Sequence, residues 1–217
     1  MELSAFAYIL RNSATKEVFY FFKGTVPRTK EYLASTGDNT GFNNDDVMSA
    51  DRLIKGMPGD VKASNARWML ARVYYIDEAG NKKVLVESMV DQMKDSAQPD
   101  FVKAQKGFKF ILAAHSVGTT ELAIMYTILG LAEVQPESAL ALCLGPYRVY
   151  SKATVEYMMK YAPGPWLNVI NGSDFIPLAS DIRGTIGTAY FTRPEITDEV
   201  YQKWIKDNPW DVSVEYY

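Results

Sequence analysis

The chain has 217 residues, of which 47% are hydrophobic and 23% are charged, and its formal net charge is -3. This is the composition of an ordinary globular protein, so we expect a single domain with one core over residues 1–217. With a pI of about 5.3, the chain lacks the positive charge that binding to nucleic acid requires. One cysteine, Cys143, excludes an internal disulfide. No pattern indicates a cofactor or a metal site.

The first residues, MELSAFAYILRN, contain neither a basic leader nor a long apolar run before a cleavage site. They therefore do not predict a signal peptide. No apolar run elsewhere reaches the length that a transmembrane helix needs, so we expect no transmembrane segment. Together these features predict a cytoplasmic protein.

The first third of the chain predicts two strands, over residues 5–11 and 17–22, joined by a turn that is rich in polar residues. Residues 34–60 are rich in Gly, Asn, Asp and Ser and predict an irregular loop, with a short helix over 47–54. After this loop, an aromatic and β-branched run predicts a strand over 67–76. Apolar residues at helical spacing then predict a helix over 83–98.

From residue 67 onward, strands and helices alternate. Short apolar runs predict buried strands over 108–114, 139–144, 167–170 and 185–192. Helical patterns lie between and after them, over 120–134, 152–161 and 196–207. This order predicts an α/β fold with a mostly parallel sheet that is covered by helices on both faces. Functional sites in such sheets form at the carboxyl ends of the strands.

The stretch Phe110–Ala123, FILAAHSVGTTELA, places Ser116 between a predicted strand and a predicted helix. This is the arrangement of a nucleophile elbow, whose tight turn needs small residues two positions before and two positions after the serine. Ala114 and Gly118 occupy these positions. The backbone N–H of Val117, at the start of the helix, is a natural donor to an oxyanion.

Four short motifs in this order resemble the class 3 lipase family of α/β-hydrolases. They are Lys23-Gly24-Thr25 after a strand, AHSVGT at 114–119, LGPYRV at 144–149 and NGSDFIP at 171–177. The resemblance implies that Ser116 is the nucleophile and Asp174 the acid of a triad. It also implies that Thr25 and the Val117 N–H form the oxyanion hole, and that 34–60 lies where the family has its lid elements.

The catalytic base of that family is missing. Where its members carry a histidine followed by x-Gly, this chain has Thr185-Ile186-Gly187. The one histidine of the chain, His115, stands where the family has a non-catalytic histidine, and we expect it to pack behind the turn and to hydrogen-bond locally. Apart from Lys23 of the first motif, no lysine lies in a motif, and the two arginines of the region, Arg183 and Arg193, cannot act as bases.

These observations leave two hypotheses open. In the first, the protein is a catalytically degenerate lipase-like protein that binds a protein partner or a lipid or ester ligand, or serves in an assembly. Ser116 is then a small residue in a tight turn, and Asp174 forms an Asx turn or a helix cap. In the second, the protein is an active serine esterase or lipase whose base is unusual or comes from a partner. The missing histidine favours the first hypothesis, whereas the joint presence of Ser116, Gly118 and Asp174 favours the second.

Overall fold

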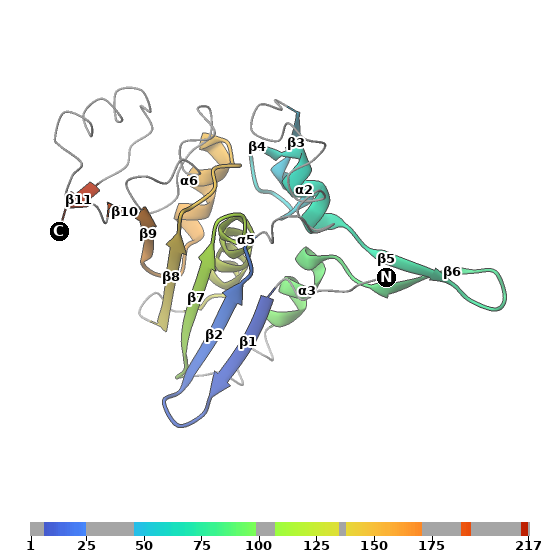
Figure 1. Ribbon diagram of the computed structural model, residues 1–217, viewed down its shortest axis with the longest axis horizontal. Helices are drawn as coiled ribbons and strands as arrows, with labels where there is room; N and C mark the ends of the chain where they lie inside the picture. Colours follow the sequence, from blue (N-terminus) through green and yellow to red (C-terminus); the bar gives the residue numbers. More distant parts are fainter. Residues whose placement is uncertain are drawn as a thin grey trace.

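A computed structural model describes residues 7–24, 46–98, 107–134, 138–170, 188–191 and 214–216. Within these residues, one seven-stranded sheet forms the centre of the molecule, in the order β1-β2-β7-β8-β9-β10-β11 (Figure 1). Its strands are β1 Ala7–Asn12, β2 Glu17–Phe22, β7 Lys109–His115, β8 Ala139–Leu144, β9 Trp166–Ile170, β10 Thr188–Phe191 and β11 Val214–Tyr216.

The sheet is parallel except at its first strand. β1 and β2 form an antiparallel hairpin, and β2 then pairs in parallel with β7, with Tyr20 opposite Leu112. Each following pair of neighbouring strands in the sheet is also parallel. Parallel neighbours require crossover connections. Within the described residues, α-helices lie between β2 and β7, between β7 and β8, and between β8 and β9. The predicted mostly parallel α/β sheet is therefore confirmed.

Helix α5 (Gly118–Leu131) is the central helix of the core. Its residues from Gly118 to Leu129 are all buried, and it contacts β2, β7 and β8 as well as helices α3 (Met89–Ser96) and α6 (Lys152–Tyr161). This explains why its sequence is apolar nearly all round. No helix in the described part of the chain is both long enough and apolar enough to cross a membrane.

The predictions for residues 67–98 are wrong in part. The run that predicted one strand over 67–76 is divided between helix α2 (Ala63–Leu70) and strand β5 (Val73–Ile76). The predicted helix over 83–98 is divided between strand β6 (Lys82–Val86) and helix α3. The aromatic run obscured the helix because the buried side chains of α2 begin upstream of it, at Ala63 and Asn65.

The short helix predicted over 47–54 is replaced by a strand and a single 3₁₀ turn. Strand β3 (Val47–Ser49) pairs antiparallel with β4 (Asp60–Lys62), and the 3₁₀ turn follows β3 at Ala50–Arg52. The N–H of Ala50 donates to the carbonyl oxygen of Gly59 at 2.9 Å, which closes the loop between the two strands. The predicted C-terminal helix over 196–207 lies outside the described residues.

The C-terminal end of α5 passes very close to α6. A Cβ atom added to Gly130 would lie 1.6 Å from the carbonyl oxygen of Tyr161, the last residue of α6. Glycine is therefore required here by the close approach of two backbones.

We expect Gly130→Ala to lower the free energy of unfolding by about 1–3 kcal/mol, because the added methyl group must push the two helices apart. Urea unfolding followed by circular dichroism measures the change. Leu131→Ala is the matched control, since Leu131 is exposed in the same helix and its truncation should cost much less. Equal effects of the two substitutions would contradict this account of the helix contact.

Candidate functional site

The turn between β7 and α5 holds Ser116 in a strained backbone conformation. Its φ angle is +54°, a region that residues other than glycine rarely adopt. Three hydrogen bonds hold the residue in place. The Ser116 N–H donates to the carbonyl oxygen of Leu144 at 3.0 Å, and the Ser116 carbonyl oxygen accepts from the Thr119 N–H at 3.0 Å and from the Thr119 hydroxyl at 2.6 Å. The serine is thus fixed between β7, β8 and the first turn of α5.

The small residues on either side of Ser116 are needed because β2 passes close to the turn. A Cβ atom on Gly118 would lie 2.7 Å from the carbonyl oxygen of Lys23 and 2.9 Å from that of Phe22, at the end of β2. Ala114 is buried on the other side of the turn. The end of β2, which carries the Lys23-Gly24 motif, is therefore packed directly against the serine turn.

The start of α5 offers a backbone donor next to the serine. Val117 already has helical backbone angles, and no described residue accepts a hydrogen bond from its N–H. The first N–H groups of a helix lack partners within the helix and carry the positive end of its dipole. The role of this N–H as an oxyanion donor stays a prediction.

His115 does not lie where we predicted it. It is exposed rather than packed behind the turn, and its Nδ1 atom lies 3.0 Å from the position of a Cβ atom built on Gly24. Among the described residues, no hydrogen bond joins the His115 imidazole to the Ser116 hydroxyl. The alternation of side chains along β7 explains the exposure, because Leu112 and Ala114 take the buried positions and His115 follows on the opposite face.

The segment that follows β8 lies beside the same turn. The Tyr147 N–H donates to the Thr119 hydroxyl at 3.0 Å, so this hydroxyl bridges Ser116 and the segment. The buried Lys62 ammonium, from β4, donates to the Tyr147 hydroxyl at 2.9 Å. Arg148 is also buried, and burial lowers its pKa to about 10. The third sequence motif is thus brought to the serine turn.

The other candidate residues fall outside the described part of the chain. These are Thr25, Asp174 and Thr185, so their roles stay predictions. Ile170, the residue before the NGSDFIP motif, ends β9, which pairs in parallel with β8. The described residues contain no group of three or more His, Cys, Asp or Glu side chains that could hold a metal ion.

Sequence reasoning missed one buried acid next to the turn. Glu121, in the first turn of α5, is 2% exposed, and one of its carboxyl oxygens accepts from the Trp68 indole N–H at 3.2 Å. Its other oxygen has no partner among the described residues. Burial raises the pKa of Glu121 to about 8, against the ordinary 4.5. Its signal in the sequence is a single charged residue within an otherwise apolar helix.

Comparisons with solved structures identify the fold. A fungal lipase in a lipase-inhibitor complex matches with a TM-score of 0.58 and 18% identity, over 85% of this chain and 60% of its own. A lipase from Rhizopus microsporus var. chinensis matches with a TM-score of 0.57 and 16% identity, over 86% of this chain and 56% of its own. The Rhizomucor miehei lipase propeptide complex matches with a TM-score of 0.60 and 14% identity, over 85% of this chain and 51% of its own.

No protein-family model and no curated protein sequence matches the chain. The chain spans less than two thirds of the length of these three lipases. Likeness at such low sequence identity shows the fold alone. This protein therefore has a lipase-like α/β-hydrolase fold, as the four motifs predicted.

The raised pKa of Glu121 leads to a prediction about stability and pH. A folded-state pKa above the unfolded value means that the folded protein holds a proton which the unfolded chain releases between about pH 4.5 and pH 8. The Glu121 contribution to the free energy of unfolding should therefore decrease as the pH rises through this window. It should level off above about pH 8.

We expect Glu121→Gln, which keeps the oxygen facing Trp68 and cannot ionise, to lose this pH dependence. Urea unfolding of both proteins from pH 5 to pH 9 measures the difference. The variant should gain stability relative to the wild type as the pH rises, by a few kcal/mol at most. Parallel pH profiles of the two proteins would show that Glu121 is already ionised in the folded protein at pH 5, so that its pKa is not raised.

Proposed function

We propose that this protein is a catalytically degenerate lipase-like protein, which binds a ligand or a protein partner instead of hydrolysing esters. One observation carries the proposal. The chain contains a single histidine, and this residue, His115, is exposed against Gly24 and makes no hydrogen bond with Ser116. A serine nucleophile needs a neighbouring base to take its proton, and this chain offers no imidazole for that role.

The remaining roles follow the resemblance to class 3 lipases. Ser116 takes the place of the nucleophile and Asp174 that of the acid, while Thr25 and the Val117 N–H take those of the oxyanion hole. Thr185 takes the place of the missing base, and its hydroxyl cannot accept a proton at neutral pH as an imidazole does.

Lysine could replace histidine as a base only if its ammonium reached the serine hydroxyl. Lys62 is buried near the turn, but it donates to the Tyr147 hydroxyl instead. Among the described residues, no lysine hydrogen-bonds to Ser116. The geometry near Ser116 therefore favours loss of the base over its replacement.

The expected loss of rate is large. Removing one member of a serine triad lowers the rate by roughly 10⁴–10⁶, and about 10³ over water can survive through the oxyanion hole and binding. Loss of the base therefore leaves a site that can still bind a ligand. The Val117 N–H at the start of α5 can hold a carbonyl or carboxylate oxygen, which suits an ester or lipid ligand.

A second function is favoured by the backbone strain at Ser116. A φ angle of +54° at a serine costs free energy and persists only when surrounding contacts impose it, which is typical of functional sites. This observation supports an active serine esterase or lipase whose base is an unusual group of this chain. The two functions differ in whether the Ser116 hydroxyl of the isolated protein is reactive.

Labelling with a fluorophosphonate probe, followed by intact mass measurement, distinguishes them. This probe forms an adduct with a serine that a neighbouring base activates. We expect the wild-type protein to gain no mass under conditions that fully label an active lipase. An adduct on the wild type that Ser116→Ala abolishes would overturn the proposal and establish an activated serine.

His115→Gln serves as the matched variant in the same experiment. If His115 were a hidden base, wild-type labelling would occur and would be lost in His115→Gln. If the base were another group, labelling would survive this substitution. Circular dichroism of each variant verifies that the fold is retained.

A further inference from the structure

Strands β5 and β6 form a two-stranded ribbon, which we call the arm, that projects from the body of the molecule (Figure 1). Five of its apolar side chains are between 41% and 65% exposed, namely Tyr74, Tyr75, Ile76, Val84 and Leu85. Isolated two-stranded ribbons are only marginally stable in water. Exposed apolar side chains that lie close together are typical of a protein interface.

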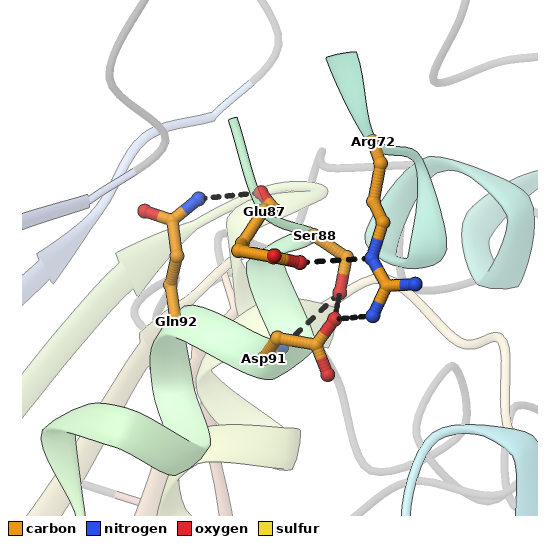
Figure 2. A network of polar contacts seen from close by, with 5 residues as sticks. All are labelled: Arg72, Glu87, Ser88, Asp91 and Gln92. Atoms are coloured by element: carbon orange, nitrogen blue, oxygen red, sulfur yellow. Dashed lines mark hydrogen bonds and ion pairs between the residues drawn. The ribbon is translucent and has the colours of Figure 1, made fainter. Parts of the chain in front are cut away.

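A network of polar contacts fixes the arm at its base (Figure 2). The guanidinium of Arg72, which precedes β5, pairs with Glu87 at 2.9 Å and with Asp91 of α3. Ser88 caps α3 by accepting from the Asp91 N–H, and its hydroxyl donates to the Asp91 carboxylate at 2.6 Å. Both ends of the arm are therefore held against α3, and these contacts fix the direction in which the arm projects.

One of the two free edges of the arm belongs to β5. The Asp77 N–H donates to the carbonyl oxygen of Asn81 at 3.0 Å, so it points toward β6. Because backbone groups alternate along a strand, those of Tyr75 also point toward β6, whereas those of Tyr74 and Ile76 point outward. Among the described residues, β6 is the one strand that pairs with β5. β5 is thus an edge strand with unpaired backbone groups, ready to pair with another strand.

We propose that β5 pairs antiparallel with β5 of a second copy of this chain, about a two-fold axis at Tyr75. In this register, Tyr74 faces Ile76 of the second copy. The N–H of each residue in this pair donates to the carbonyl oxygen of the other. The two Tyr75 side chains meet at the axis. The same register brings Arg72, just before β5, toward Glu78 of the second copy, in the turn after β5, and the symmetry repeats this approach of opposite charges. Aromatic and oppositely charged cross-strand pairs stabilise such a sheet.

The alternation of backbone groups and the charges select this register. A shift by one residue would set outward groups of one strand against inward groups of the other, so no ladder could form. A shift by two residues would place Arg72 opposite Ile76 or Gly80 and lose the ion pair. The side chain of Arg72 is 42% exposed despite its contacts at the arm base, so it can receive a further carboxylate.

The charges of the arm favour a second copy over an anionic lipid surface. Two acids, Asp77 and Glu78, balance two lysines, Lys82 and Lys83. A neutral arm gains little from negatively charged lipid, but it can approach its own copy without net repulsion. This interface is separate from the Ser116 turn, so its existence does not depend on the proposed function.

Cysteine cross-linking of the full chain tests the register. Tyr75→Cys should form a disulfide-linked dimer under mild oxidation, because residues on the two-fold axis lie within reach of each other. Tyr74→Cys is the matched control, since it is similarly exposed but faces Ile76 of the second copy. The native Cys143 is buried and should not react. Cross-linking of neither variant, or of Tyr74→Cys instead, would overturn the proposed pairing.

Sedimentation velocity over a range of concentrations tests the dimer itself. We expect the wild type to reach twice the 24.4 kDa mass of one chain. Glu78→Lys places two like charges beside each other at both ends of the interface and should weaken association by about tenfold or more. Glu78 is exposed, so this variant should fold. A wild-type protein that stays monomeric at high concentration, or association that Glu78→Lys leaves unchanged, would contradict the proposal.

Discussion

The close approach of β2 to the β7–α5 turn is the constraint on which the rest of the site depends. Gly118 has no room for a side chain because the carbonyl oxygens of Phe22 and Lys23 lie against it. The turn is therefore tight, Ser116 is held at a positive φ, and α5 begins directly beside the serine. The same crowding places His115 against Gly24. One packing constraint thus shapes the serine turn and positions the one imidazole of the chain beside it.

The sequence predicted well wherever apolar runs were short and bounded by glycine or polar residues. Strand 139–144 and helix 152–161 have the predicted bounds, and the strand before Ser116 is displaced by one residue. Prediction failed over 67–98, where aromatic and β-branched residues concealed the division into α2, β5, β6 and α3. Local patterns could not show that division, because the arm that β5 and β6 form is exposed on both faces and follows no core periodicity.

At the site too, the local sequence predicted some features, whereas others depend on how segments far apart in the sequence pack. Motifs at strand ends pointed to the ends of β2 and β7, which do lie together, and the end of β8 lies beside them. The exposure of His115 and the role of Thr119 as a bridge to Tyr147 depend on how strands of distant sequence approach each other. Glu121 is buried in α5, the helix that also carries Thr119. No short sequence motif marks its position as unusual.

The central claim is that this chain holds a lipase-like serine turn without a base. The most direct measurement is the rate of hydrolysis of a short-chain nitrophenyl ester by the wild type, by Thr185→His and by the same histidine variant carrying Ser116→Ala. The account predicts a low wild-type rate that does not depend on Ser116, a clear gain in Thr185→His, and loss of that gain when Ser116 is removed. A wild-type rate well above buffer that depends on Ser116 would contradict it.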